Sequence, residues 1–372
     1  MPLFKNLNKY THFDNILIGN NIYNDIGNIL EKRLTSKPFL AIITDNNVAS
    51  LYLKSIEESL NSSGFNFIKI IIPAGESSKN FYQVQDIINK LSNHKIKRND
   101  FIIALGGGII GDLAGFVASI YMRGIGFINI PTSLLAQIDA SIGGKTAINT
   151  SFGKNLVGSF YNPSLIITDT QFLRSLNKRE FISGYAEILK YGLINDYEFF
   201  TFCEKQFNNI FSHKSALNYA IEQCILKKIE IVKQDKFDHN QRALLNLGHS
   251  FGHALEHYCQ YNSELLLHGE AVAIGIVLAF QFSAYVGLCS NDCVIRITNH
   301  LEKVGLPASI NIKIFEQLKA NTLLEAMSFD KKNINNAFNL ILAKDIGKAF
   351  IAKGVSGETL FNFFIKILDK KN

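Results

Sequence analysis

The sequence predicts an α/β fold in which an N-terminal domain with a parallel sheet is followed by an all-helical domain. Short apolar runs alternate with helix-length segments in the first half of the chain, and long helical patterns without strands fill the second half. The 372 residues also exceed the usual length of one domain. We therefore expect a first domain at residues 1–170 and a second at residues 171–372.

The strands of the first domain are predicted from apolar runs rich in β-branched residues. Runs of this type indicate a parallel sheet that helices cover on both faces. Ligands of such sheets bind beyond the carboxyl ends of the strands, so functional residues should follow these runs. The predicted strands are Asn15–Gly19, Phe39–Asp45, Phe67–Ile72, Phe101–Gly108 and Gly126–Ile130.

The second domain is predicted from apolar residues at helical spacing. No linker rich in proline, glycine and serine precedes it, and the chain has no internal repeat. The longest apolar stretch, Ala271–Phe280, is well short of the ~20 residues that a membrane-spanning helix needs. The predicted helices lie within Lys178–Gln206, Ser215–Lys236, Arg242–Tyr258 and Gly269–Val286.

Composition predicts a soluble cytoplasmic protein. Hydrophobic residues make up 47% of the chain and charged residues 19%, and the N-terminus lacks the apolar core of a secretory signal. The five cysteines are scattered, which disfavours a disulfide framework, and the pair Cys289 and Cys293 has no further ligands nearby for a metal. The net charge of +6 includes no basic block, so it indicates an ordinary solvated surface or a small-anion site rather than nucleic-acid binding.

A glycine-rich turn follows the fourth predicted strand. Gly106, Gly108 and Gly111 have the spacing G-x-G-x-x-G, and with Gly107 they open a predicted helix. Such a turn lets backbone amides approach a pyrophosphate at the positive end of a helix dipole. The motif does not follow the first strand, and no acidic residue lies ~20 positions later, so an ordinary Rossmann half is disfavoured. A tight turn without a ligand is the alternative.

Polar side chains at other strand ends support a nucleotide site. Asp45 and Glu76 can accept hydrogen bonds from ribose hydroxyls, and Lys79 offers a charge to a phosphate. Thr132 and Ser133 add hydroxyls after the fifth predicted strand. Each of these residues alone is more often a helix cap or part of a solvated turn.

A glycine-rich, loop-like region carries a cluster of charged residues. Lys145 follows two consecutive glycines, which suits the recognition of a phosphate or a carboxylate. A Walker P-loop is excluded because Asp139 occupies the place of its first glycine. A plain surface loop is the alternative. The other members of the cluster are Arg123, Lys154 and Asn155.

Histidines and a carboxylate indicate a metal site. His249 and His253 are four residues apart, so on a helix both rings lie on one face. His268 begins another predicted helix, and Glu187 lies on a third. Two histidines and one carboxylate suit a catalytic zinc ion, but the spacing leaves open which histidines bind it, and a structural histidine pair is the alternative. Nearby polar and cationic residues favour an acidic substrate over a merely solvated surface: Lys190, Lys228, Arg242 and Asn246.

Seven motifs follow one another along the chain: PAGESSK, GGGIIGD, PTSLLAQIDASIGGKTAIN, GKNLVGSFYNP, SGYAEILKYG, LLNLGHSFGHALE and LLHGEAV. Together and in this order they resemble the 3-dehydroquinate synthase family, over the chain from about Asp45 to Lys332. The resemblance implies an α/β NAD-binding domain at residues 1–170 and a helical metal- and substrate-binding domain at residues 171–372. It also implies a homodimer, in which Arg123 reaches the site of a neighbouring subunit.

The resemblance assigns a role to individual residues. Zinc, or cobalt in its place, is expected at Glu187, His249 and His268. The substrate's phosphate, carboxylate and hydroxyls are expected at Lys145, Asn155, Lys190, Lys228, Arg242, Asn246 and His253, with Arg123 from a second copy. NAD is expected at Asp45, Glu76, Lys79, Gly107, Gly108, Asp112, Thr132, Ser133, Asp139, Lys145 and Lys154, with Phe172 and Ser175 near its adenosine.

The implied reaction converts 3-deoxy-D-arabino-heptulosonate 7-phosphate to 3-dehydroquinate and phosphate, in the shikimate route. Oxidation of the C5 alcohol acidifies the neighbouring hydrogen, phosphate leaves by β-elimination, hydride returns, and an aldol reaction closes the ring while zinc polarises substrate oxygens. Other sugar phosphate cyclases and NAD-dependent polyol dehydrogenases are the alternatives. The family's D-E-x-E pattern is altered at Lys236 and Asp238, and Ala74 replaces a frequent Asp.

Overall fold

The computed structural model describes residues 16–212, 215–235, 241–328 and 337–369. The chain divides into two compact units. Unit 1 comprises Met1–Leu176 and Ile221–Lys233, and unit 2 comprises Asn177–Ala220 and Gln234–Asn372. The segment Ile221–Lys233, expected in the second domain, thus groups with unit 1. Among the described residues, no helix has the length and apolar character to cross a membrane.

Unit 1 is built on a parallel sheet of six strands, in the order β1-β8-β5-β4-β2-β3. The five predicted strands are present, and β8, which pairs with β1 and β5, is additional. The strands are β1 (Ile16–Gly19), β2 (Leu40–Asp45), β3 (Phe67–Ile72), β4 (Phe101–Gly106), β5 (Gly126–Pro131) and β8 (Leu165–Asp169).

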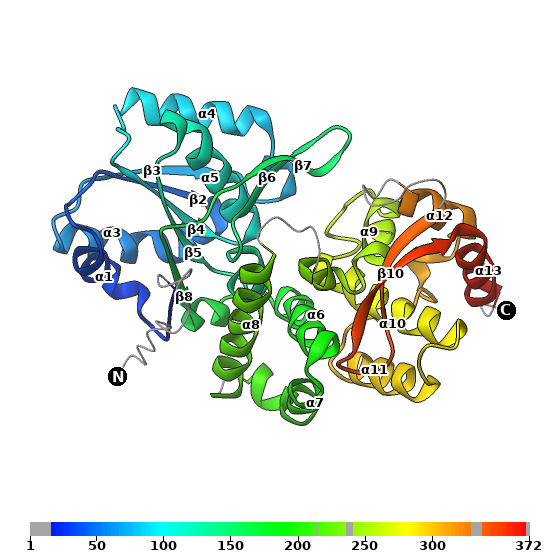
Figure 1. The fold of residues 1–372 in the computed structure, drawn as a ribbon. Coiled ribbons are helices and arrows are strands. Elements are labelled where there is room, and N and C mark those ends of the chain that lie inside the picture. The colour runs from blue at the N-terminus through cyan, green and yellow to red at the C-terminus, as the bar shows by residue number, and fades with distance from the viewer. Residues whose placement is uncertain (1–15, 213–214, 236–240, 329–336, 370–372) are drawn as a thin grey trace. The chain divides into compact units, whose positions relative to one another are not determined.

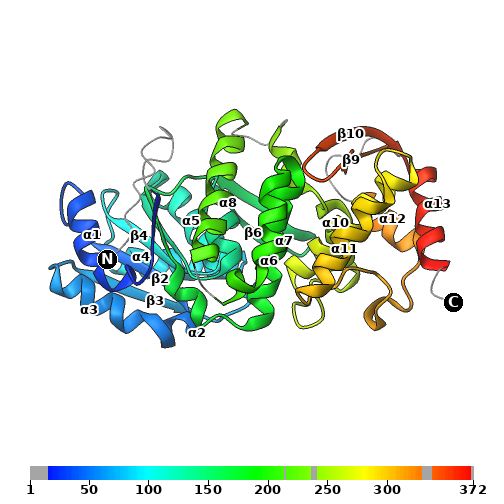
Figure 2. The ribbon, with the colours of Figure 1, turned by 90° about the horizontal axis from the view of Figure 1, so that it is seen from below.

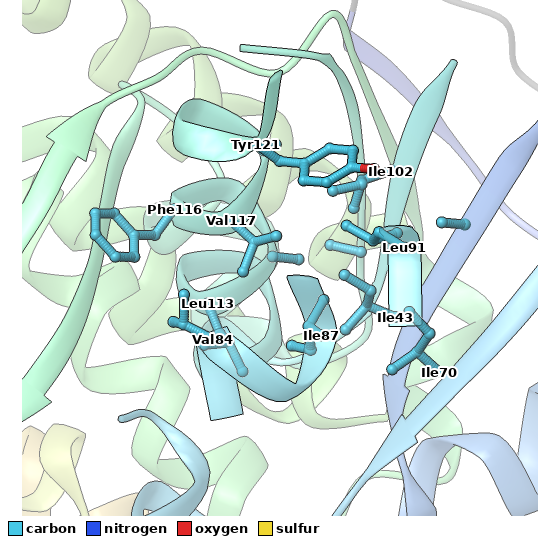
Figure 3. Close-up of a cluster of buried hydrophobic side chains, with 14 of the residues drawn as sticks. Ile43, Ile70, Val84, Ile87, Leu91, Ile102, Leu113, Phe116, Val117 and Tyr121 are labelled. Carbon is cyan, nitrogen blue, oxygen red and sulfur yellow. The ribbon is translucent and has the colours of Figure 1, made fainter. Parts of the chain in front are cut away.

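Helices cover both faces of this sheet, as the apolar strands predict (Figure 1). Helices α1 (Ile26–Arg33) and α3 (Lys54–Ser62) pack on one face through one cluster of buried aliphatic residues. Helices α4 (Phe81–Asn93) and α5 (Gly108–Ile120) pack on the other face, and Figure 3 shows their side chains in the second cluster. The buried sheet therefore provides a rigid base for the loops at its edge.

The strand order of unit 1 creates a switch point. The chain passes from β2 to β3 on one side and returns to β4 on the other side of β2. Ligands of such sheets bind outside the carboxyl ends of the strands at this point. The turns that follow β2 and β4 begin at Asp45 and Gly106, so they flank it.

The region that was expected to be loop-like forms a hairpin of β6 (Lys145–Thr150) and β7 (Gly153–Phe160). The two strands pair antiparallel, with a register irregularity between Ile148 and Thr150. Thr146 and Ile148, two residues apart on β6, are buried on the face against α5, as the two-residue period of a strand allows. Lys145, Lys154 and Asn155 therefore lie on strands rather than in an irregular loop.

Unit 2 is mostly helical rather than all-helical. Helix α10 (His268–Tyr285) is buried on nearly all sides. The predicted helix Lys178–Gln206 is broken at Asp196, whose carboxylate accepts a hydrogen bond from Phe199 N and caps the next helix. The strands β9 (Ala337–Ala343) and β10 (Ala349–Ser356), which were not predicted, form an antiparallel pair (Figure 2).

The bounds of the remaining helices locate the candidate site. Helix α8 (Ser215–Gln234) contributes residues to both units. The other α-helices of unit 2 are α6 (Lys178–Asn195), α7 (Tyr197–Phe211), α9 (His249–Tyr258), α10 (His268–Tyr285), α11 (Asn291–Lys303), α12 (Ala320–Ser328) and α13 (Gly357–Leu368).

Candidate active site

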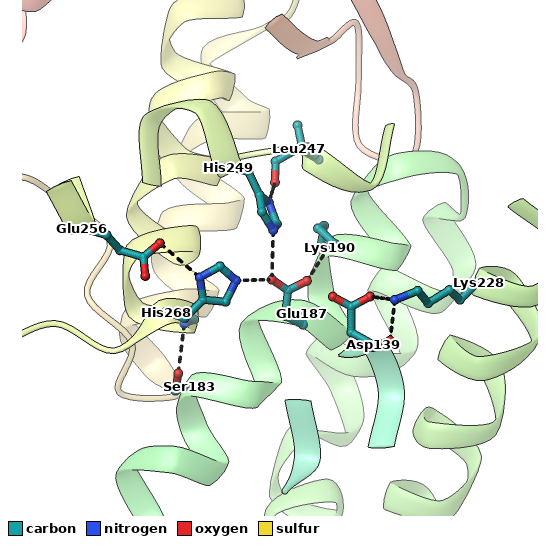
Figure 4. Close-up of polar contacts among 10 residues, drawn as sticks. Asp139, Ser183, Glu187, Lys190, Lys228, Leu247, His249, Glu256 and His268 are labelled. Atoms are coloured by element: carbon teal, nitrogen blue, oxygen red, sulfur yellow. Dashed lines mark hydrogen bonds and ion pairs between the residues drawn. The ribbon is translucent and has the colours of Figure 1, made fainter. Parts of the chain in front are cut away.

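Unit 2 brings one carboxylate and two imidazoles together. Glu187 lies on α6 and is fully buried, whereas His249 and His268 are the first residues of α9 and α10. The Nε2 atoms of both histidines lie 3.6 Å from Oε1 of Glu187 (Figure 4). One donor atom from each residue lies within 4.8 Å of the others, so the three can hold one metal ion.

Two glycines allow the three helices to approach closely enough. Gly269 donates its backbone N–H to Ser183 Oγ at 3.0 Å, and a Cβ at Gly269 would lie 1.9 Å from Ser183 O. Helix α10 can therefore begin against α6, one turn before Glu187. A Cβ at Gly275 would lie 2.0 Å from Gly248 O, so α9 and α10 are equally close. Larger residues at these glycines would separate the ligands.

The chemistry of the group fits a divalent cation. Neither carboxylate oxygen of Glu187 has a hydrogen-bond partner, although the ammonium of Lys190 forms a close ion pair with Oε2. A buried carboxylate in this state is costly unless a cation and further donors compensate its charge. Two imidazole nitrogens and a carboxylate form the usual three-residue ligand set of catalytic zinc sites.

Glu256 lies on the opposite side of the His268 ring. Its Oε2 is 3.2 Å from His268 Nδ1, and the carboxylate is buried. His253, Glu256 and His268 also form a group with metal-ligand distances. Both groups use His268, but Nδ1 faces Glu256 and Nε2 faces Glu187, so Glu256 can orient His268 toward Glu187. Sequence reasoning missed Glu256, although it follows His253 by one helical turn.

The electrostatic environment of His268 agrees with this arrangement. Burial lowers the pKa of His268, but the charge and hydrogen bond of Glu256, together with the charge of Glu187, raise that pKa above its usual value. His253 is exposed, and its ring lies 5.3 Å from that of His249 and 6.1 Å from that of His268. His253 therefore lies beside the group, at the solvent side.

The segment before α9 holds the other predicted residues of unit 2. The predicted helix Arg242–Tyr258 is divided into a 3₁₀ segment, Gln241–Asn246, and α9, because Gly248 has a left-handed φ of 82°. Arg242 is buried and donates its backbone N–H to Asp235 Oδ2 at 3.1 Å. Asn246 is half-buried. The altered positions Lys236 and Asp238 lie outside the described residues.

In unit 1, several predicted nucleotide residues meet at the switch point. Asp45 Oδ1 accepts hydrogen bonds at 2.9 Å from the backbone N–H groups of Asn47 and Val48. Gly107 caps α5, which begins at Gly108, and a Cβ there would lie 3.5 Å from Ser133 Oγ. Thr132 N–H donates to Gly106 O at 2.9 Å, which joins the ends of β5 and β4. The amides at the start of α5 thus lie next to the Ser133 hydroxyl.

Lys79 contacts protein oxygens from two other segments. The lysine is buried, and its Nζ lies 2.5 Å from both Asp112 Oδ2 and Asn155 Oδ1. Burial raises the pKa of Asp112 above its usual value, although the charge of Lys79 opposes the shift. Glu76 Oε1 accepts a hydrogen bond from Asn149 Nδ2 at 2.6 Å. The Glu76 turn is therefore joined to α5 and to the β6–β7 hairpin.

The remaining cations of unit 1 differ in exposure. Lys228 is buried on α8 and contacts both the carboxylate and the carbonyl oxygen of Asp139 (Figure 4). Lys145 is exposed, and Lys154 is half-buried. Arg123 is exposed in a turn and has a left-handed φ of 62°. Lys145 and Arg123 are thus the solvent-facing members of this set.

An aromatic group surrounds the predicted adenosine residues. Phe172 is buried, and the Ser175 hydroxyl lies 2.5 Å from the Tyr52 hydroxyl. The ring of Tyr52 lies edge-on to Phe172 at 4.7 Å, and that of Tyr23 lies 5.1 Å from Phe172. Sequence reasoning missed both tyrosines because only the folded sheet brings their segments together.

The fold, the group of Glu187, His249 and His268, and the residues at the switch point define a class of metal-binding α/β enzymes. Known structures have the same fold. The structure resembles ValA, a 2-epi-5-epi-valiolone synthase from Streptomyces hygroscopicus subsp. jinggangensis 5008 with NAD+ and Zn2+ bound, with a TM-score of 0.86, 25% identity, and coverage of 96% of this chain and 97% of that one. A 2-deoxy-scyllo-inosose synthase with carbaglucose-6-phosphate, NAD+ and Co2+ has the same fold, with a TM-score of 0.83, 23% identity, and coverage of 94% and 96%. The predicted fold class is confirmed.

Sequence comparisons identify the family within this class. Family models described as 3-dehydroquinate synthase N-terminal and C-terminal match residues 69–183 and 184–333. The 3-dehydroquinate synthase of Bartonella bacilliformis is 49% identical over 87% of this chain and 86% of its own length. That of Rhizobium johnstonii is 44% identical over 94% and 92%. The chain belongs to the 3-dehydroquinate synthase family, which confirms the resemblance.

Proposed function

We propose that this protein converts 3-deoxy-D-arabino-heptulosonate 7-phosphate to 3-dehydroquinate and phosphate, with NAD and a zinc or cobalt ion. The observation that carries the proposal is the buried carboxylate of Glu187 facing the Nε2 atoms of His249 and His268. The relatives of 49% and 44% identity, which are 3-dehydroquinate synthases, support this choice of reaction. Two related cyclase structures hold NAD+ with Zn2+ or Co2+, which supports the cofactors.

In this proposal, unit 2 binds the metal and the carboxylate of the substrate. Glu187, His249 and His268 hold the ion, which when bound polarises substrate oxygens. Glu256 keeps the proton on His268 Nδ1, so that Nε2 is the donor atom for the metal. The buried guanidinium of Arg242 can bind a carboxylate with two parallel hydrogen bonds. Lys190, Asn246 and His253 complete the substrate contacts of this unit.

Unit 1 binds NAD and the phosphate in the same proposal. NAD, which accepts a hydride and later returns it, lies at the switch point of the sheet. Lys145 is exposed at the start of β6, where its ammonium can bind the phosphate together with Asn155 and Lys228. The other NAD contacts are those that the resemblance implies: Asp45, Glu76, Lys79, Gly107, Gly108, Asp112, Thr132, Ser133, Asp139, Lys154, Phe172 and Ser175.

We also propose a homodimer in the cytoplasm. Arg123 is exposed in a turn, so its side chain is available to the substrate site of a second copy. All five cysteines are free thiols, which suits a reducing compartment. Two functional domains at residues 1–170 and 171–372 belong to the same proposal.

A phosphate-release assay tests the function. The purified protein is given the heptulosonate phosphate, zinc and a small amount of NAD, and phosphate and NADH are followed together. Many phosphates released per NAD, without accumulating NADH, support the proposal. Stoichiometric NADH indicates a dehydrogenase instead, and turnover of a neutral sugar phosphate without turnover of the acid indicates another cyclase.

A further inference from the structure

Asn149, near the end of β6, contacts two segments that the sequence gives no reason to connect. Its side-chain Nδ2 donates to Glu76 Oε1 at 2.6 Å, and its Oδ1 accepts from the backbone N–H of Asn155 at 3.0 Å. Its own backbone N–H donates to Lys79 O at 2.8 Å. One half-buried residue thus joins the turn after β3 to the β6–β7 hairpin.

The chemistry of its partners fixes the orientation of the Asn149 amide. A carboxylate only accepts hydrogen bonds, so the amide nitrogen must face Glu76. A backbone N–H only donates, so the amide oxygen must face Asn155. Both partners together permit one arrangement, and the contact with Glu76 is strengthened by its charge.

The same contacts determine how Asn155 is presented. Its φ of 56° lies in the left-handed region, which a residue other than glycine adopts only when surrounding contacts hold it. The bond to Asn149 fixes its backbone, and Lys79 Nζ lies 2.5 Å from its Oδ1. Because an ammonium group only donates, the amide nitrogen of Asn155 must point away from Lys79.

We propose that Asn149 is a positioning residue that couples NAD binding to substrate binding. It aims the carboxylate of Glu76 at the ribose hydroxyls of NAD, and it holds Asn155 so that the amide nitrogen of Asn155 faces the phosphorylated substrate. Asn149 itself touches neither ligand. The inference rests on the proposed function, from which the ligands of Glu76 and Asn155 are taken.

The first test is Asn149→Ala in the full-length enzyme with zinc. We expect the dissociation constant of NAD and the KM of the heptulosonate phosphate each to rise about tenfold, because a charge-assisted bond and a backbone bond are lost. Amide hydrogen exchange across residues 145–160 should accelerate. The matched control is Ser151→Ala, an exposed position in the turn of the same hairpin, which should leave all three measurements unchanged.

Asn149→Asp separates positioning from simple stabilisation of the hairpin. The aspartate still accepts from Asn155 N–H, but it places a second carboxylate against Glu76. We expect NAD to bind at least as weakly as in Asn149→Ala, whereas the substrate KM and hairpin exchange stay near those of the parent. This variant also serves if Asn149→Ala does not fold.

Two results would overturn the inference: parental NAD binding in both variants, or identical changes of NAD binding, KM and exchange in both. The proposed function fails separately, if the parent enzyme releases no phosphate from the heptulosonate phosphate. NAD affinity and hydrogen exchange would still test the role of Asn149 in that case.

Discussion

The two units treat their buried charged groups differently. In unit 1, the buried ammonium groups contact carboxylates of the same unit: Lys79 contacts Asp112, and Lys228 contacts Asp139. In unit 2, the fully buried carboxylate of Glu187 pairs with Lys190 through Oε2 only, and Oε1, which faces His249 and His268, has no hydrogen-bond partner. A compensated buried charge is compatible with a structural role, whereas an under-compensated one lowers stability and indicates a binding function.

The largest effect is expected from Glu187→Gln. Loss of the carboxylate should abolish tight metal binding and lower turnover by about a thousandfold, because a bound metal supplies several kcal/mol of catalysis. Metal content after dialysis and phosphate release measure this. Because Glu187→Gln also leaves the buried ammonium of Lys190 without its carboxylate, metal content rather than melting temperature decides the assignment. Glu180→Gln, exposed on the same helix, is the control. Parental metal content in Glu187→Gln would contradict the assignment.

Lys79→Met should mainly lower the stability of the fold. The substitution leaves the carboxylate of Asp112 without its cation, which is expected to lower the free energy of unfolding by about 3 kcal/mol. Urea-induced unfolding measures the change. Lys90→Met is the matched control, because Lys90 pairs with Asp86 on the surface and should contribute less than about 1 kcal/mol. Equal losses in both variants would show that the buried pair of Lys79 and Asp112 contributes no more to stability than a surface pair.

Unit 2 also buries a group that stays uncharged, His300. Its Nε2 lies 3.0 Å from the Tyr185 hydroxyl, and burial lowers its pKa to about 4, with Lys303 and Arg296 adding to the shift and Glu204 opposing it. The unfolded state, with a pKa near 6.5, binds the proton first. Stability should therefore be complete above pH ~6.5 and fall by up to about 3 kcal/mol as the pH decreases toward ~4.

The pH dependence of His300 is measured against His300→Gln. Urea unfolding of both proteins at pH 7.5 and pH 5 gives the loss for each, and the loss should be smaller in the variant. The comparison uses the change with pH rather than absolute stability, because the substitution itself alters packing against Tyr185. Equal losses in the two proteins would show that His300 does not titrate in this range.

Glu256→Gln tests whether metal binding by Glu187, His249 and His268 depends on the carboxylate of Glu256, which contacts His268. The amide can still accept a hydrogen bond from His268 Nδ1 but carries no charge. We expect metal affinity to fall by about 10- to 100-fold, as is typical for the outer partner of a histidine ligand. Competition with a chromophoric chelator measures the affinity without relying on activity. Glu264→Gln, exposed before α10, is the control. Unchanged affinity would mean that His268 is oriented by its backbone position alone.

The sequence predicted features whose signals are local. The apolar runs of β2 and β4, the glycine turn after β4 and the histidine spacing all lie within short segments. Strand β8 was not predicted, although its run LIITD carries the same local signal as the run LAIITD of β2. The strands β9 and β10 were missed in a region that read as helical.

In the candidate site, too, the sequence could not predict what depends on tertiary contacts. Spacing alone could not choose between His249 and His253, because the choice depends on where α10 begins relative to α6. The close approach at Gly269 sets that position, and no local pattern reveals it. Glu256 and Asn149 were missed for the same reason, since their partners are identified only by tertiary contacts.

The smallest expected effect, from Arg242→Lys, separates the proposed reaction from that of related cyclases. Only the heptulosonate substrate carries a carboxylate, and the lysine keeps the positive charge but loses the two parallel donors of the guanidinium. We expect kcat/KM for the acid to fall about tenfold, which corresponds to ~1.4 kcal/mol of lost transition-state stabilisation. The NAD dissociation constant should stay at the parental value.

Arg242 is buried, so its replacement also affects packing, and the melting temperature must be measured with turnover. Arg98→Lys, at an exposed position, controls for the exchange of one cation for the other. A variant that melts early and loses NAD binding as well as turnover assigns Arg242 to the fold rather than to the substrate. If Arg242→Lys melts normally and turns over the acid at the parental rate, the carboxylate is bound elsewhere. The protein is then better interpreted as a cyclase of neutral sugar phosphates, because that reaction would use the same metal ligands, Glu187, His249 and His268, and the same NAD residues.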